Sequence, residues 1–151
     1  MDFEGLTDEF MLYGTLFALS NRIQTFVDGK LTNLTAKQQF FLIVLSLFEE
    51  NKPSLKEAAE VIGCTYQNVK RMADSLEKNG FLIVERDSDD KRKYNLSATD
   101  KFLLSLEAGH DSYDFMQSIY QGISAEDLKC TLNTLVKIEE NIKLEAITKE
   151  S

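Results

Sequence analysis

The sequence has few of the residues that interrupt regular structure: one proline and seven glycines among 151 residues. A β-sandwich or β-barrel needs turn residues every few positions, so this scarcity argues against both folds and favours helices. Histidine is scarcer still, because His110 is the only one, and this excludes a multi-histidine metal site. The sequence leaves open only a mixed cluster of His110 with Asp111 and Asp114. We expect no metal site and no cofactor.

Cysteine and long apolar runs are also in short supply. Cys64 and Cys130 lie far apart and form no CxxC pair, so they indicate neither a zinc site nor a disulfide scaffold. The N-terminus shows no signal-peptide pattern, which favours a reducing cytoplasm. The longest apolar run, Phe40–Leu45, has six residues, whereas a membrane-spanning helix needs about 20. We therefore expect a cytoplasmic protein with no membrane partner.

Positive charge is scarce overall but concentrated in one place. The formal net charge is −8 and the isoelectric point is about 4.7. Residues 1–53 carry four cations and seven anions (net −3), residues 94–151 carry five and ten (net −5), and residues 54–93 carry eight of each. The middle segment includes the run Ser88–Tyr94, SDDKRKY, with three consecutive cations. Acidic surfaces repel nucleic acid, so DNA binding requires the cations of the middle segment to share one face.

The first half of the chain predicts helices with well-marked starts. Residues 5–28 place apolar side chains at close to helical spacing. Thr35–Gln38 is a capping-box pattern, and a very apolar helix follows it to about Phe48. Ser54–Glu57 is a second capping box, and the short helix behind it is amphipathic. Its apolar residues are Leu55, Ala58, Ala59 and Ile62.

The centre of the chain predicts a winged helix. Gly63 ends the short helix, and Thr65 is placed to cap a helix over 65–78. Two helices joined by a three- or four-residue turn containing glycine are typical of a helix-turn-helix. Asn79–Gly80 supplies a stop, and residues 81–97 read as a β-hairpin. The expected buried side of the second helix carries Val69, Met72, Ala73 and Leu76.

Helices are also expected after the hairpin. Thr99 is placed to cap a long helix to about Gln121, and Ser124–Asp127 is placed to cap another. The last helix has an apolar stripe formed by Leu128, Leu132, Leu135, Ile138 and Ile142. The apolar faces at both ends of the chain have no obvious partner, which favours a homodimer. The alternative is that they pack on their own domain.

The second helix of the helix-turn-helix carries the chemistry for reading DNA. Its polar face presents amides and cations in the N-terminal half: Tyr66, Gln67, Asn68, Lys70 and Arg71. Arginine can bond the O6/N7 edge of guanine in two places, and glutamine or asparagine can do the same for adenine. Thr65 and the free N–H groups of the first turn can hold a phosphate. The alternative to DNA reading is that this is an ordinary solvated face of a polar helix.

The run Gly80–Thr99, GFLIVERDSDDKRKYNLSAT, resembles the wing of the MarR family of winged-helix transcriptional regulators. The residues that fall on the family pattern are Gly80, Asp90, Arg92, Leu96 and Thr99. Upstream, Leu34, Thr35 and Gln38 are similar to the family's LTxxQ helix opening. The resemblance covers residues 30–102 closely. It departs at Ala98, where the family usually has leucine, and at Phe102, where it usually has glycine.

The resemblance implies a mainly α fold with a small β-hairpin wing: a winged helix-turn-helix flanked by N- and C-terminal dimerisation helices. Residues 1–151 would form a single domain, with a DNA-binding core at 30–102 and dimerisation helices at 1–29 and 103–151. A homodimer would place helix 65–78 in the major groove of a pseudo-palindromic operator and wing 86–94 in the minor groove. Arg92 would enter that groove with Asp90 supporting the wing. Further candidate DNA contacts are Lys91, Lys93 and Ser54.

The resemblance also raises the question of regulation. Many relatives release DNA when a small amphipathic effector binds near the dimer interface, and the resemblance leaves the existence of such an effector open for this chain. Leu16–Leu19 is similar to the Cys-Phe-Ala-Leu of a peroxide-sensing branch, but Leu16 stands where the reactive thiol would be. This argues against peroxide sensing by that route. We expect Cys64 to be buried packing and leave the redox role of Cys130 open.

Three functions compete. The leading hypothesis is a homodimeric repressor that binds a double-stranded DNA operator. The alternative is a winged-helix protein-interaction module that has lost DNA binding, which the net charge of −8 favours. Interspersed acidic residues such as Glu77, Glu85 and Asp89 would support it. An enzyme is not expected, because the sequence has no catalytic triad, paired-carboxylate signature, glycine-rich phosphate loop or metal spacing.

Overall fold

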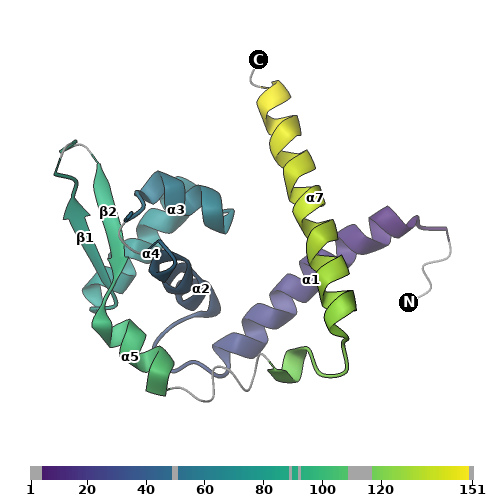
Figure 1. The fold of residues 1–151 in the computed structure, drawn as a ribbon, viewed down its shortest axis with the longest axis horizontal. Helices are drawn as coiled ribbons and strands as arrows, with labels where there is room; N and C mark the ends of the chain where they lie inside the picture. Colours follow the sequence, from purple (N-terminus) through teal and green to yellow (C-terminus); the bar gives the residue numbers. More distant parts are fainter. Residues whose placement is uncertain (1–4, 49–50, 89, 92, 109–116, 150–151) are drawn as a thin grey trace. The chain divides into compact units, whose positions relative to one another are not determined.

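The computed structural model describes residues 5–48, 51–88, 90–91, 93–108 and 117–149. Figure 1 shows its elements, which in chain order are α1 (Asp8–Asp28), α2 (Ala36–Ser46), α3 (Leu55–Ile62), α4 (Tyr66–Lys78), β1 (Leu82–Arg86), β2 (Tyr94–Ala98), α5 (Asp100–Ala108) and α7 (Ala125–Lys149). The chain divides into two compact units, Met1–Glu107 and Ala108–Ser151. The expected class, a mainly helical winged helix-turn-helix with helices at both ends of the chain, is confirmed.

The helix starts in the first unit follow from local cap chemistry. Thr35 and Ser54 each accept a hydrogen bond from the backbone N–H three residues on, and the side chain at that position bonds back, so both capping boxes are formed. The Thr65 hydroxyl accepts from the Asn68 N–H at 3.3 Å. Gly63 ends α3 with φ of 65°, a left-handed conformation in which a β-carbon would be strained. These local hydrogen bonds and the left-handed Gly63 therefore set where α3 and α4 begin and where the turn between them lies.

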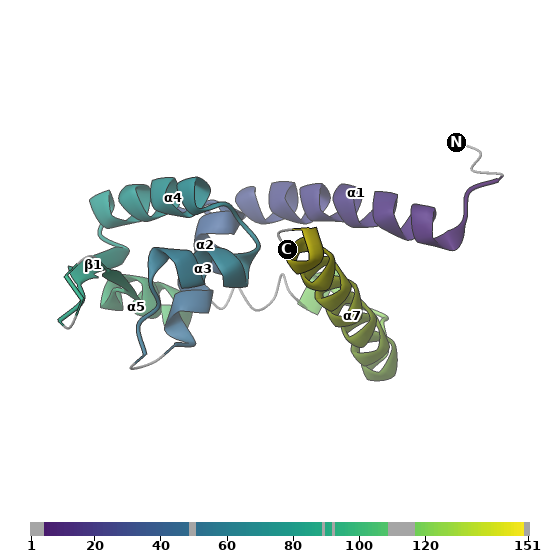
Figure 2. The same ribbon diagram turned by 90° about the horizontal axis from the view of Figure 1, so that it is seen from above.

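The hairpin closes the core of the first unit from one side. β1 and β2 pair antiparallel, with Val84 opposite Leu96. The segment before α3 adds to β2, since the Leu96 N–H donates to the Pro53 carbonyl at 2.9 Å. Figure 2 shows the same elements from above. The core that they enclose consists of Phe41, Leu42, Leu45, Ala58, Ala59, Val69, Ala73, Leu76, Phe81, Leu82, Leu96 and Phe102.

Two hydrogen bonds connect the junction between the hairpin and α5 to the residues that follow α4. The Thr99 hydroxyl donates to the Gly80 carbonyl at 2.8 Å, and the Thr99 N–H donates to the Phe81 carbonyl at 3.1 Å. The sequence predicts one helix from Thr99 to about Gln121. Helix α5 ends at Ala108 and residues 117–119 are helical; the stretch between them, with His110, Asp111 and Asp114, lies outside the described residues.

Helix α1 is exposed along most of its length, and its C-terminal end meets α2. Val27 is its one buried residue, and the Asp28 carboxylate accepts a hydrogen bond from the Ala36 N–H at 2.6 Å. Further back, the rings of Phe10, Tyr13 and Phe17 follow one another along one face, with centroids 6.1 and 5.0 Å apart. These aromatic side chains are about 60% exposed.

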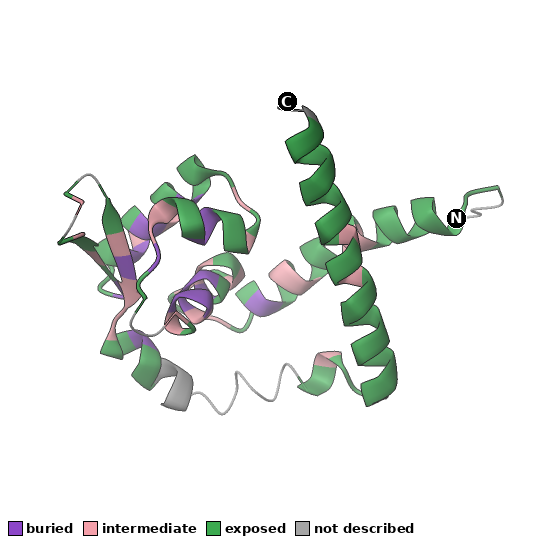
Figure 3. Cartoon of the chain, turned by 45° about the horizontal axis from the view of Figure 1, so that its top comes forward, coloured by how far each residue is buried: buried purple, intermediate pink, exposed green. Residues whose placement is uncertain are grey.

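The second unit is dominated by α7. The Ser124 hydroxyl accepts from the Asp127 N–H at 3.0 Å, so the predicted cap is confirmed. Figure 3 shows that α7 is exposed along nearly its whole length. Its exposed apolar side chains are Leu128, Leu132, Val136, Ile142, Leu144 and Ile147. Within the described ranges, no helix is long and apolar enough to cross a membrane.

Candidate nucleic-acid interface

Helix α4 separates its apolar and polar residues onto opposite faces. Val69, Ala73 and Leu76 are buried and Met72 is half-buried, as the sequence predicts. The candidate DNA-reading residues are all exposed: Thr65, Tyr66, Gln67, Asn68, Lys70 and Arg71. The exposed acids of α4, Asp74 and Glu77, lie in its C-terminal half. The N-terminal half thus carries only neutral and cationic groups, at the end where the helix dipole is positive.

Two of the candidate readers contact each other. The Arg71 guanidinium donates a hydrogen bond from Nη2 to the Asn68 side-chain oxygen one turn earlier. Residues three apart on a helix are neighbours, so this contact needs no change in the backbone. The contact holds the planar guanidinium of Arg71, which has five N–H donors, on the polar face of α4.

A hydrogen bond ties α4 to the start of α2. Gln38 Nε2 donates to Ser75 Oγ at 3.3 Å, while Gln38 Oε1 accepts from the Thr35 N–H at 3.0 Å. One side chain therefore completes the capping box of α2 and contacts the recognition helix. The sequence predicted the first role and not the second, because the partner lies 37 residues away.

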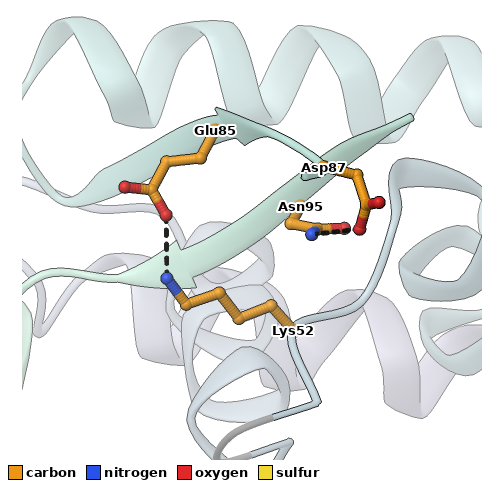
Figure 4. Close-up of polar contacts among 4 residues, drawn as sticks. All are labelled: Lys52, Glu85, Asp87 and Asn95. Atoms are coloured by element: carbon orange, nitrogen blue, oxygen red, sulfur yellow. Dashed lines mark hydrogen bonds and ion pairs between the residues drawn. The ribbon is translucent and has the colours of Figure 1, made fainter. Parts of the chain in front are cut away.

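Most of wing 86–94 is the polar segment between β1 and β2, residues 87–93. Lys91 and Lys93 are exposed, and Asp90 is half-buried. Arg92, the candidate minor-groove residue, lies outside the described residues, as does Asp89. The Asp87 carboxylate accepts two hydrogen bonds. Oδ1 accepts from the Asp90 N–H at 2.8 Å. Oδ2 accepts from Asn95 Nδ2, also at 2.8 Å (Figure 4). Asp87 and Asn95 are not among the site residues predicted from the sequence, although an aspartate that opens a polar turn is a known turn signal.

Acidic side chains near the wing interact with lysines. Lys52 Nζ lies 2.8 Å from Glu85 Oε2, so one acidic residue that would favour the protein-binding alternative is already paired (Figure 4). The pKa of Glu57 is lowered, first by its hydrogen bonds with Ser54 and then by the positive charge of Lys93. Lys93 is therefore near enough to Glu57, in the first turn of α3, for the two charges to interact. Ser54, the candidate contact at that start, is half-buried and forms a β-bridge with Asn95.

The cysteines occupy different environments. Cys64 is half-buried against the core, and Cys130 is exposed on α7. Neither forms a disulfide. Within the part of the chain that the structure describes, no group of three or more histidine, cysteine or acidic side chains could hold a metal ion.

A capped helix-turn-helix followed by a two-stranded hairpin, with a polar outer face on its second helix, defines a winged helix-turn-helix protein. Residues 37–94 match the model of the MarR family. The resemblance predicted from the sequence is thereby confirmed over this stretch. No protein of curated function matches the chain in sequence.

Solved structures of MarR-family regulators share the fold. The S. aureus MepR–DNA complex is 22% identical with a TM-score of 0.75, over 86% of this chain and 97% of that one. A MarR protein from Peptoclostridium difficile is 24% identical with a TM-score of 0.72, over 96% and 94%. A MarR/EmrR family transcriptional regulator from Acinetobacter sp. is 15% identical with a TM-score of 0.78, over 92% and 99%. The chain therefore has the fold of MarR-family transcriptional regulators.

Proposed function

We propose that the chain is a homodimeric transcriptional repressor that binds a pseudo-palindromic double-stranded DNA operator. Helix 65–78 enters the major groove and wing 86–94 reaches the minor groove. The observation that carries the proposal is the division of α4: an inner face packed against the core and an outer face whose N-terminal half has no acidic residue. A rigid helix with its readers at the N-terminal end suits direct contact with base edges.

The proposed contacts divide into base-reading and phosphate-binding groups. Gln67, Asn68 and Arg71 have side chains that match base edges. Thr65, Tyr66 and Lys70 flank them on the same helix, where hydroxyl and ammonium groups suit phosphate oxygens. The exposed wing cations Lys91 and Lys93 suit the backbone of the adjacent groove. Arg92 is proposed for the minor groove from the sequence alone, because a narrow groove has an enhanced negative potential.

The exposed apolar faces of α1 and α7 support the homodimer. Leu6, Phe10, Tyr13 and Phe17 are 45–61% exposed on or beside α1, and Leu132 and Ile142 are more than 60% exposed on α7. Large exposed apolar surface commonly marks a protein–protein interface. Two copies of a half-site reader would bind two half-sites one helical turn of DNA apart. Release by a small amphipathic effector near the dimer interface belongs to the same proposal.

The competing function, a protein-interaction module without DNA binding, is favoured by the net charge of −8 and by exposed Asp74 and Glu77. These two acids lie away from the first turns of α4, and Glu85 is paired with Lys52. Among the described residues, fewer acidic side chains therefore lie between the cations of the candidate surface than the competing function requires.

A selection of bound fragments from the source genome, followed by anisotropy titrations of the recovered duplex, tests the proposal. We expect a two-fold symmetric consensus and an affinity that falls steeply with salt, because each neutralised phosphate releases counterions. Lys70→Ala should flatten the slope of log K against log salt by about one. Recovery of no consensus, with equally weak binding to all duplexes, would favour the competing function.

A further inference from the structure

The backbone of the wing is closed by a ring of three hydrogen bonds. Asp90 N–H donates to Asp87 Oδ1 at 2.8 Å, Lys93 N–H donates to the Asp90 carbonyl at 2.8 Å, and Asp87 N–H donates to the Lys93 carbonyl at 3.1 Å. The three residues are spaced three apart, and each donates one bond and accepts one. Two of the three bonds are between backbone groups. The bond to Asp87 Oδ1 is the one that a side chain makes and a substitution can remove.

The same carboxylate anchors the ring to the hairpin. Its second oxygen accepts from Asn95 Nδ2 at 2.8 Å, and Asn95 lies on β2 opposite Glu85 in the strand register. Glu85 is in turn paired with Lys52, so the base of the wing is held from both strands (Figure 4). Asp87 is the first residue beyond β1 and is half-buried, whereas Lys91 and Lys93 are exposed. One side chain therefore connects the paired strands to the cationic turn.

We infer that Asp87 is the positioning residue of the wing: its carboxylate fixes the turn that presents Lys91 and Lys93 to DNA. The inference rests on the proposed DNA-binding function. It gives the support of the wing to Asp87, in addition to the Asp90 that the family resemblance indicates. Asp90 enters the ring through its N–H and its carbonyl, which any residue other than proline could supply at that position.

The physical reason is the entropy of ordering a polar turn. A segment without apolar anchors must lose conformational freedom when it binds DNA, and each backbone residue that is fixed adds to the entropic cost. Hydrogen bonds made beforehand by Asp87 remove part of that cost, so the lysines are in place before the encounter. Hydrogen bonds to a charged acceptor are also stronger than neutral ones.

Charge alone predicts the opposite effect of removing Asp87. A carboxylate beside DNA-facing cations weakens the attraction to phosphates, so its loss should tighten binding if electrostatics were its whole effect. Asp87→Ala should instead weaken operator binding roughly tenfold, the equivalent of about one hydrogen bond to a charged group. Asp87→Asn keeps an oxygen for the Asp90 N–H while losing the charge. Its NH2 group can donate to the Asn95 side-chain oxygen once the Asn95 amide turns over, so both contacts are kept and the variant should bind at least as well as the wild type.

The first measurement is an anisotropy titration of the full chain with its operator at several salt concentrations. Glu77→Gln is the matched control for charge loss: Glu77 is exposed in the C-terminal half of α4, outside the wing. We expect Asp87→Ala to bind weakly with a flatter salt slope, and Asp87→Asn and Glu77→Gln to bind like the wild type or more tightly. Equal affinities for Asp87→Ala and Asp87→Asn would overturn the inference. Urea unfolding of each variant checks that the first unit, Met1–Glu107, is folded.

A second measurement needs no DNA. Amide hydrogen exchange in the free protein, read by NMR, should show the Asp90 amide protected in the wild type and Asp87→Asn but faster by tenfold or more in Asp87→Ala. An unchanged exchange rate of the Asp90 amide in Asp87→Ala would contradict the positioning role, even if the wild type binds its operator. If the wild type bound no duplex, the proposed function would fall and the exchange data would still decide whether Asp87 orders the wing.

Discussion

Arg71 donates a hydrogen bond from its guanidinium to the side-chain oxygen of Asn68, one turn earlier on α4. In this arrangement Arg71 uses one of the two lone pairs of the Asn68 side-chain oxygen, so that oxygen can accept only one further hydrogen bond from a base. Arg71 is held in an orientation that a free side chain would have to find on binding. The two residues should therefore act on DNA as a pair.

A double-mutant cycle tests this pairing. If Arg71 reads a guanine, Arg71→Ala should cost about 1–3 kcal/mol of discrimination at that base pair. Asn68→Ala should then lose part of the same discrimination, and the double variant should cost less than the sum, by roughly 0.5 kcal/mol or more. The measurement is the affinity for the operator and for a duplex changed at one base pair. Strict additivity would mean that the two side chains read DNA separately.

Gln67 offers an independent test of the recognition helix. It is exposed in the first turn of α4, and no hydrogen bond of its side chain is among those that the structure describes. Gln67→Ala should reduce discrimination by about 1–3 kcal/mol at one position of the operator. Lys78→Ala is the control, because Lys78 is exposed in the last turn of the same helix. A randomised-site selection that returned an unchanged consensus for Gln67→Ala would place the base-reading residues elsewhere.

Phe102 and Ala98, the two departures from the family pattern, both belong to the core. Phe102 is 1% exposed within the core cluster, and Ala98 packs against that cluster. A small residue stands where the family usually has a large one, and a large residue stands four positions later where the family usually has glycine. We therefore predict that the two departures compensate in volume. Phe102→Ala should lower the free energy of unfolding by about 3–5 kcal/mol.

Urea unfolding measures that loss, and Leu104→Ala is its control, since Leu104 is 62% exposed on the same helix. The control should change the free energy of unfolding by less than about 1 kcal/mol, because little apolar surface leaves the core. A family-like double variant, Ala98→Leu with Phe102→Gly, should be less destabilised than the two single losses combined. If the double variant were as unstable as the sum, volume compensation would not be the reason for these residues.

The sequence predicted the parts of the fold that local chemistry specifies. The caps at Thr35, Ser54 and Ser124 need only the residue three positions on, and all three are confirmed. The ring at Asp87 and the bond from Gln38 to Ser75 depend on the path of the chain between distant residues, which periodicity does not reveal. The burial of Phe102 was missed for a related reason: a departure from a family pattern does not say which neighbour has made room.

Glu57 makes part of the stability depend on pH. Its hydrogen bonds with Ser54 and the charge of Lys93 lower its pKa in the folded protein. The stabilisation is therefore fully present above the unfolded-state pKa of about 4.3 and is lost as the pH falls through the lower folded value. Glu57→Gln keeps an oxygen for the Ser54 N–H but does not titrate. The wild type should lose its advantage over Glu57→Gln below about pH 4, as urea unfolding between pH 7 and 3 would reveal. A constant difference across that range would assign the acid sensitivity to other carboxylates.

The exposed aromatic face of α1 should decide the oligomeric state. Phe17 is 61% exposed and stacks edge-on against Tyr13, so a second copy could cover both rings. Phe17→Asp places a charge where the proposed dimer would bury it, at a cost of several kcal/mol unless it is paired. We expect the wild type to sediment as a dimer and Phe17→Asp to shift to monomers at micromolar concentration. Thr15→Asp, an equal charge two residues away on the same exposed helix, is the matched control.

DNA titrations of Phe17→Asp distinguish the effect of dimerisation from the effect of base reading. A monomer keeps α4 and the wing, so Phe17→Asp should retain salt-dependent binding to a single half-site. It should lose the added affinity for two half-sites, because the second contact is no longer at the high effective concentration that a dimer provides. Phe17→Asp that remained a dimer would move the interface away from this face of α1. Equal binding of monomer and dimer to the full operator would mean that the chain reads DNA one copy at a time.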